Sequence, residues 1–240
     1  MTGSEDRAGL ELSVVIPAYN EADRLGLTLE RVLGYLDRRR ILHEVLVVDD
    51  GSHDVTFEIA AAHGEQGVRA LRQEANRGKG AALKTGVLAS HGELVLLCDA
   101  DLSTPIEDLE RLEARLPETD LVLGSRGAAG ADVTVHQPFY REAMGKSFNL
   151  IIRALGVRGL RDTQCGFKLL RGDVARELFG ALTIERFAFD VELIWLARRR
   201  GYQISEVGVR WANSRASKVD PVVDSLRMLR DVLLFRWRHR

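Results

Sequence analysis

The sequence predicts one α/β domain with a mostly parallel central sheet flanked by helices, and three observations support this prediction. Apolar runs typical of strands buried on both faces alternate with helical patterns over the first 125 residues. Several of these runs end in polar loops, as strands of open α/β sheets do at a ligand-binding edge. The chain has 240 residues with 45% apolar and 29% charged side chains, enough for one domain with a full core.

The first three strands and two helices follow from apolar spacing. Leu12–Pro17 predicts a buried strand, and the residues from Glu21 to Arg39 predict a helix whose leucines recur on one face. Glu44–Val48 predicts a second strand, which ends in Asp49-Asp50-Gly51-Ser52. A helix over about 54–63 and a short strand over 68–71 follow.

The next elements continue the alternation. Asn76-Arg77-Gly78-Lys79-Gly80 is a glycine-rich turn that leads into a helix over 81–90; such a turn binds phosphate in some proteins and is a plain strand-to-helix turn in others. It lacks the spacing of a P-loop. Leu94–Leu97 predicts a central strand, followed by a helix over about 105–115 and a strand over 120–124.

The second half shows weaker periodicity. We expect a mobile loop over 125–137, a helix over 139–155, a turn over 162–168 and a helix that ends near Arg200. A last strand is predicted over 203–211, and residues 213–218 are expected to form a loop with two cations.

Asp99 and Asp101 follow the central strand with one residue between them. Two carboxylates at the end of a buried strand suit Mg²⁺ or Mn²⁺ on a diphosphate, but aspartates in this position also cap the following helix. The residues alone leave both interpretations open. Because polar loops follow three predicted strands, after Pro17, Val48 and Leu97, a ligand site at this sheet edge is favoured.

Charge and cysteine content limit the function classes. The formal net charge of −1 divides into −10 for residues 1–120, with 13 basic and 23 acidic residues, and +9 for residues 121–240, with 21 and 12. The basic half suggests anionic partners such as phosphates or lipid headgroups. Two distant cysteines, Cys98 and Cys165, imply no disulfide framework, which fits a cytoplasmic protein. No basic patch is interleaved with aromatic residues, so we expect no nucleic-acid partner.

The last twenty residues, from Pro221 to Arg240, predict an amphipathic helix. Its apolar stripe is Val222, Leu226, Leu229, Leu233 and Trp237, and arginines crowd its flanks. This pattern suits a helix lying in a membrane interface, but it also suits a helix packed on the domain with its arginines in water. No stretch approaches the roughly 20 apolar residues that span a bilayer.

Four short blocks together resemble the family 2 glycosyltransferases, which have the GT-A fold. They are Val15–Glu21, Val48–Ser52, Asn76–Gly80 and Asp99–Asp101, in the family's order and spacing. Further blocks, among them Asp162–Lys168 and Phe189–Glu192, most resemble the dolichyl-phosphate β-glucosyltransferases, with the mannosyltransferases as near neighbours. The resemblance implies a disordered segment 1–11, a GT-A domain 12–218 with a nucleotide-sugar half 12–125 and an acceptor half 126–218, and the terminal helix 219–240.

The resemblance also implies which residues bind the donor. The positions that match the family's nucleotide-sugar site are Pro17, Tyr19, Glu21, Asp49, Asp50, Lys79 and Asp99. Asp50, or in its place Asp49, would bond the base, and Lys79 would meet the nucleotide sugar. Asp99 and Asp101 would hold Mg²⁺ or Mn²⁺. Ser103 stands where mannosyl relatives often carry glutamine, which favours the glucosyl branch and leaves the third metal ligand open.

The catalytic residues implied by the same resemblance are Asp101, Arg126, Arg141, Arg215 and Lys218. Arg126 and Arg141 would face the two phosphates, and Arg215 and Lys218 would close over the site. Gln164, Asp190 and Glu192 would contact the sugar or the acceptor.

The implied activity is inverting transfer of a hexose, glucose from UDP-glucose, to a polyprenyl or dolichyl phosphate on the inner face of a membrane. An acceptor phosphate is already ionised near neutral pH, so this chemistry needs charge neutralisation more than a general base. The alternatives are a GDP-mannose donor, a soluble acceptor and a nucleotide-sugar-binding module without catalysis. Homo-oligomers and a membrane-protein partner remain open.

Overall fold

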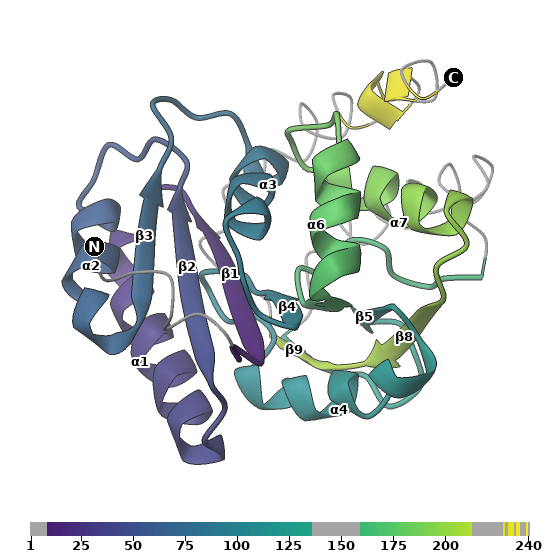
Figure 1. Ribbon diagram of the computed structural model, residues 1–240, viewed down its shortest axis with the longest axis horizontal. Coiled ribbons are helices and arrows are strands. Elements are labelled where there is room, and N and C mark those ends of the chain that lie inside the picture. The colour runs from purple at the N-terminus through teal and green to yellow at the C-terminus, as the bar shows by residue number, and fades with distance from the viewer. Residues whose placement is uncertain are drawn as a thin grey trace.

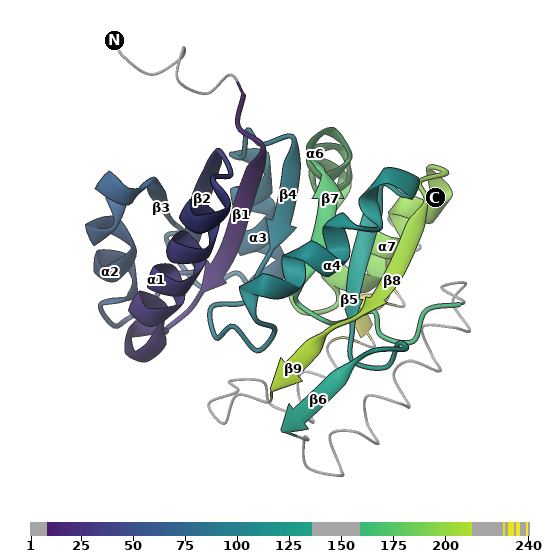
Figure 2. The ribbon, with the colours of Figure 1, turned by 90° about the horizontal axis from the view of Figure 1, so that it is seen from below.

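A computed structural model of the chain describes residues 9–135 and 159–212, together with residues 228, 230–232, 234, 235 and 239. Its centre is a seven-stranded sheet in the order β3-β2-β1-β4-β7-β5-β8, with helices on both faces (Figure 1). A separate ribbon pairs β6 with β9 (Figure 2). The predicted fold class is therefore confirmed.

The first half follows the predicted alternation closely. Its elements are β1 (Leu12–Ala18), α1 (Ala22–Arg39), β2 (His43–Asp49), α2 (Thr56–Ala62), β3 (Val68–Arg72), α3 (Lys79–Leu88), β4 (Leu94–Leu97), α4 (Leu109–Glu113) and β5 (Leu121–Ser125). Short 3₁₀ turns cover Gly64–Gln66, Ile106–Asp108 and Leu116–Glu118. The strands β2, β1 and β4 lie side by side and parallel, so the three polar loops do gather at one edge.

The second half departs from prediction in three places. The expected loop over 125–137 contains β6 (Asp132–Val135), and the predicted last strand divides into β8 (Ile204–Gly208) and β9 (Arg210–Ala212). A helix that the sequence pattern did not reveal, α6 (Gly172–Ala181), precedes α7 (Phe189–Arg199). Strand β7 (Lys168–Arg171) runs antiparallel between β4 and β5.

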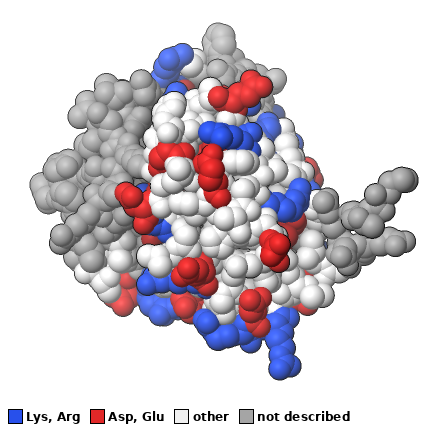
Figure 3. Space-filling model, turned by 90° about the vertical axis from the view of Figure 1, so that its left-hand side faces the viewer, with Lys and Arg blue, Asp and Glu red and all other residues white. Residues whose placement is uncertain are grey.

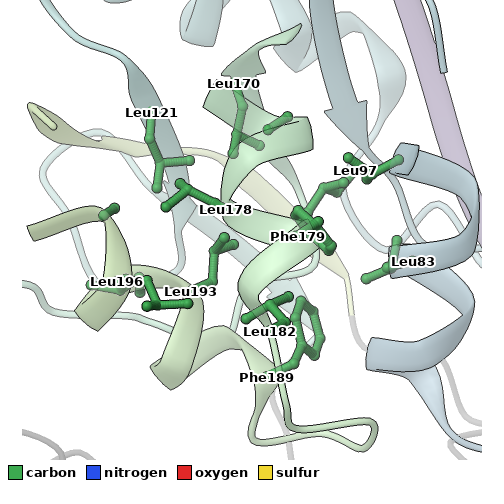
Figure 4. Close-up of a cluster of buried hydrophobic side chains, with 14 of the residues drawn as sticks. Leu83, Leu97, Leu121, Leu170, Leu178, Phe179, Leu182, Phe189, Leu193 and Leu196 are labelled. Atoms are coloured by element: carbon green, nitrogen blue, oxygen red, sulfur yellow. The ribbon is translucent and has the colours of Figure 1, made fainter. Parts of the chain in front are cut away.

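The strands bury alternate side chains in two cores. Val14 and Ile16 of β1 face α1 and α4, whereas Val15 between them packs with α3 and α6. Figure 4 shows the second core, where Leu97 and Leu170 of the sheet lie near Phe179 of α6. The sheet is thus packed on both faces, and this packing holds in place the strand ends from which the polar loops extend.

Two terminal predictions can be compared with the structure in part. Leu10 and Glu11 make backbone hydrogen bonds with residues next to β4 and β2. Glu93 N donates to Leu10 O at 2.9 Å, and Glu11 N donates to Leu42 O at 2.8 Å. Leu10 and Glu11, which belong to the predicted disordered segment 1–11, are therefore part of the folded domain, and residues 1–8 lie outside the described residues. In the C-terminal segment, Met228, Val232 and Phe235 are buried in the core with α6 and α7. The predicted apolar stripe itself lies outside the described residues.

The face over α1, α2 and β3 carries acidic and basic side chains intermixed, with no large area of one sign (Figure 3). The net negative charge of residues 1–120 therefore does not form a single acidic patch on this face.

Candidate functional site

The loops after β1 and β2 are joined by hydrogen bonds. Asn20 N donates to Ser52 Oγ at 2.8 Å, and Asn20 Oδ1 accepts from His53 N at 2.8 Å. Glu21 N donates to Thr56 Oγ1 at 2.7 Å. Tyr19 lies at the same seam, with its ring edge-on to His53 at 6.4 Å between centroids. The predicted pocket residues Pro17, Tyr19 and Glu21 are thereby half-buried along one rigid rim.

The two aspartates at the end of β2, Asp49 in the strand and Asp50 directly after it, are both buried and both bonded within the protein. Asp49 accepts from Ser52 N at 3.0 Å and lies 3.2 Å from Arg72 Nε. Asp50 accepts from the backbone N–H groups of Arg77 and Gly78, each at 2.8 Å. Burial raises the pKa of Asp50 above its ordinary value, although these two bonds oppose the shift. Asp50 therefore anchors the glycine-rich turn, and its contact with a base stays a prediction.

Lys79 opens α3 and meets the loop after β4. Its Nζ lies 2.5 Å from Asp99 Oδ1. Burial alone would raise the pKa of Asp99, but the Lys79 ammonium outweighs it and lowers that pKa. Burial likewise opposes charge on Lys79, yet Asp99, Asp190 and Asp101 together raise its pKa. The pair is therefore ionised, and it lies where donor and metal were predicted.

Gly166 makes room for Asp99. A Cβ at this position would overlap the Asp99 carboxylate, so the turn before β7 must carry glycine for the carboxylate to lie where it does.

Asp101 lies on the far side of the same charge cluster. Ser103 N donates to its Oδ1 at 2.9 Å, and Arg24 NH1 lies 3.8 Å from its Oδ2. Arg24 is itself hydrogen-bonded to Glu21, with its NH2 2.8 Å from Glu21 Oε1. The predicted donor residues Glu21, Lys79, Asp99 and Asp101 are thus parts of one network.

The two carboxylates fit a divalent cation. Within the described residues no cluster of three or more His, Cys, Asp or Glu side chains is placed to hold a metal. Two carboxylates are nevertheless what Mg²⁺ commonly takes from a protein when substrate phosphates complete its shell. Asp99 and Asp101 both help to raise the pKa of Lys79, Asp99 more strongly than Asp101, so both carboxylates contribute to the charge around this lysine.

A second ion pair lies behind the first and was not predicted. Lys168, the first residue of β7, is 2.6 Å from Asp190 Oδ1 and also donates to Cys165 O. Burial raises the pKa of Asp190, with Lys168 and Lys79 opposing the shift. A sequence signal for this pair existed: Lys168 stands at the start of an apolar stretch, and a buried cation needs a buried anion as its partner.

Arg126, predicted to face a phosphate, lies against Asp162. The guanidinium donates from Nε to Oδ2 at 2.6 Å and from NH2 to Oδ1 at 2.9 Å, and it lies over the Trp211 ring at 5.3 Å. Burial alone would raise the pKa of Asp162, but Arg126 lowers it to about 2. Asp162 is thus a further residue of the site that the sequence did not assign a role.

Of the remaining predicted residues, Arg141, Arg215 and Lys218 lie outside the described residues. The chain does lead toward the site, since Ala212 N donates to Ser103 O at 2.9 Å, two residues from Asp101. Gln164 N donates to Asp162 Oδ1 at 3.1 Å, beside Arg126.

Glu192 is directed elsewhere. Its oxygens accept from Thr183 and from Ile184 N, and the side chain is fully buried. The structure therefore places Asp190 with the charge cluster and Glu192 apart from it.

Comparisons with known proteins identify the family. A model of the family described as glycosyl transferase family 2 matches residues 13–179, so the chain belongs to this family. It is therefore a glycosyltransferase by class, and the predicted GT-A fold is confirmed by solved structures. Manganese-bound glucosyl-3-phosphoglycerate synthase from Mycobacterium tuberculosis has a TM-score of 0.71 at 22% identity, covering 96% of this chain and 81% of that one. Mannosyl-3-phosphoglycerate synthase from Rubrobacter xylanophilus has a TM-score of 0.72 at 20% identity, covering 96% and 75%.

Curated relatives are more similar in sequence. The dolichyl-phosphate beta-glucosyltransferase of Drosophila melanogaster is 39% identical over 98% of this chain and 77% of its own length. The human protein of that name is 37% identical, covering 95% and 76%, and that of Saccharomyces cerevisiae is 32% identical, covering 97% and 76%. The predicted resemblance to this branch of the family is confirmed.

Proposed function

We propose that the protein transfers glucose from UDP-glucose to a dolichyl or related polyprenyl phosphate, with inversion at the anomeric carbon. The observation that carries the proposal is the cluster of Lys79, Asp99 and Asp101 at the carboxyl edge of the sheet. The names of the relatives at 32–39% identity support glucose and dolichyl phosphate as substrates.

The reaction balances without a general base. An oxygen of the acceptor phosphate, already ionised, bonds to the anomeric carbon, and the bond from that carbon to the UDP oxygen breaks. UDP leaves with the electron pair of that bond. Because both groups are anions, the protein must chiefly neutralise negative charge.

The residues divide this task by position. Asp99 and Asp101 would hold Mg²⁺ or Mn²⁺, which supplies positive charge to the diphosphate when bound. Lys79 would contact the donor beside them. Arg126, with Arg141, Arg215 and Lys218, would face the phosphates. Since Arg126 is held by Asp162 on one edge, its contact with a phosphate would use the remaining edge of the guanidinium.

The site of action would be a membrane surface, because the acceptor is a lipid. No helix among the described residues is long and apolar enough to cross a bilayer. We propose peripheral attachment on the cytoplasmic face, with the arginine-rich C-terminal segment near the headgroups.

The test is a donor panel scored by lipid extraction. Purified protein, dolichyl phosphate and Mn²⁺ are incubated with radiolabelled UDP-glucose, GDP-mannose or UDP-galactose in separate tubes. We expect label in the organic phase from UDP-glucose alone. Label from GDP-mannose would show the mannosyl alternative, and label transferred only to added 3-phosphoglycerate would show a soluble acceptor.

A further inference from the structure

The segment Thr183–Arg186, between α6 and α7, packs against the glycine-rich turn that carries Lys79. We call this segment the strap. Glu185 O accepts a hydrogen bond from Ala81 N at 2.8 Å, and the Glu185 carboxylate pairs with Arg77. The contact is backbone against backbone, because a Cβ on Gly78 would lie 2.8 Å from Glu185 O. The same holds for Gly80, whose Cβ would lie 2.8 Å from Ile184 O.

The strap is held in turn by one buried carboxylate, that of Glu192. Thr183 donates to Glu192 twice, from Oγ1 at 2.7 Å and from its backbone N at 3.0 Å. Ile184 N donates to Glu192 Oε2 at 2.7 Å. Hydrogen bonds to a charged acceptor are stronger than neutral ones, and here they fix the backbone next to the residues that touch Gly80.

The C-terminal segment contributes a further donor. His239 Nε2 lies 2.5 Å from Glu192 Oε1, and Arg199 NH1 donates to His239 O at 2.8 Å. The His239 ring packs against Trp195 at 5.6 Å and Phe235 at 6.3 Å between centroids. A chain of contacts therefore runs from the C-terminal segment through Glu192 and the strap to the turn.

The apolar packing around the strap supports this arrangement. Leu182 directly precedes the strap, and Phe189 is the first residue of α7 after it. Figure 4 shows both in the same buried cluster. Both side chains are buried in the core that contains Phe179 and Leu83, so the strap is attached to this core on both sides.

We propose that Glu192 is a positioning residue for Lys79. Glu192, completed by His239, holds the strap against the turn from one side, and Asp50 holds the turn from the other through Arg77 N and Gly78 N. Together they set where the Lys79 ammonium meets Asp99. The C-terminal segment is thereby coupled to the donor site. The proposal depends on the proposed function only for the identity of the donor.

The test compares Glu192→Gln with Glu44→Gln. Glu44 is a matched control because it is a buried carboxylate with three protein donors, Ser13 Oγ, Arg69 NH1 and His91 N, at the opposite edge of the sheet. Hydrogen exchange of the peptide covering residues 77–88 is measured without substrates. We expect exchange in this peptide to rise about tenfold in Glu192→Gln and to stay near wild type in Glu44→Gln.

Kinetics give the second readout. The KM for UDP-glucose should rise about tenfold in Glu192→Gln, while the KM for dolichyl phosphate stays unchanged. An equal change in both control and test variants, in exchange and in KM, would overturn the proposal, since it would then reflect a general loss of stability.

Two milder variants keep the test decisive if Glu192→Gln does not fold. Thr183→Val removes one bond to Glu192 at constant shape, and His239→Phe keeps the ring packing but removes the Nε2 contact. Each should speed exchange over 77–88 by about threefold. Wild-type exchange in both would overturn the proposal. Because exchange needs no substrate, a wild-type protein that fails to make glucosyl lipid would refute the proposed function alone.

Discussion

The two lysine–aspartate pairs of the site have almost the same geometry but different surroundings. The shortest N–O distance is 2.5 Å in Lys79–Asp99 and 2.6 Å in Lys168–Asp190. The side chains of the first pair are 20% and 34% exposed, whereas those of the second are 1% and 5% exposed. A ligand can therefore reach the first pair and replace one partner, while the second can only support the fold and the local charge.

The largest effect on stability is expected when the buried pair, Lys168–Asp190, is broken. Lys168→Met leaves the Asp190 carboxyl buried without its cation, so the free energy of unfolding should fall by about 3–5 kcal/mol. Urea denaturation at pH 7 measures this. A loss below about 1 kcal/mol would show that the buried pair is not what the structure indicates. Replacing both residues, with Asp190→Leu added, should restore part of the loss.

Breaking the accessible pair should instead affect ligand binding. In Lys79→Met, Asp99 remains open to solvent or to a metal, so the stability loss should be smaller than that of Lys168→Met. The dissociation constant for UDP-glucose should rise about tenfold to a hundredfold, because a charged contact to the donor is lost. Isothermal titration calorimetry measures it. Unchanged affinity in this variant would place the donor away from Lys79.

The ion pair between Asp162 and Arg126 makes the stability of the protein depend on pH. The pKa of Asp162 is lowered to about 2 by Arg126 against the effect of burial, so its contribution to stability is present above pH ~4. It is lost as the pH falls from ~4 toward 2, and amounts to about 2 kcal/mol. Unfolding measured at pH 7 and pH 3 should show about half of this loss in the wild type, roughly 1 kcal/mol, and a smaller loss in Asp162→Asn. The same loss in both proteins would contradict it.

The smallest effect is expected at a surface pair. Arg39 NH1 lies 2.7 Å from Glu113 Oε2, with both side chains about a third exposed. Glu113→Gln should cost about 0.5 kcal/mol or less in the same denaturation assay, because water screens the pair. A loss as large as that of Lys168→Met would mean that exposure does not decide the strength of these pairs.

The sequence predicted the first half of the fold well because its strands are buried on both faces. β1, β2 and β4 are each built on an apolar run, and the loop that follows each strand contains the polar residues at the edge. Helix α6 was missed because Gly172 and Gly180 weaken the helical signal at its two ends. The division of β8 from β9 at Val209 depends on their pairing with different sheets, which no local pattern encodes.

The same limit applies to the site. Lys79 and Asp99 were assigned from short motifs of the family that follow two parallel strands, β3 and β4. The pairing of Lys168 with Asp190 could not, because it requires β7 to insert antiparallel between β4 and β5. Glu192 was grouped with Asp190 by its spacing of two residues, but on a helix these positions point to different sides, and Glu192 turns to the strap.

The central claim, that Asp99 and Asp101 form the donor site with a divalent cation, is tested most directly by calorimetry. UDP-glucose is titrated into the wild type and into Asp101→Asn, each with Mn²⁺ and with EDTA. We predict binding to the wild type that weakens at least about tenfold when the metal is removed, and weak binding to the variant under both conditions. Equal affinity in all four titrations would contradict the account.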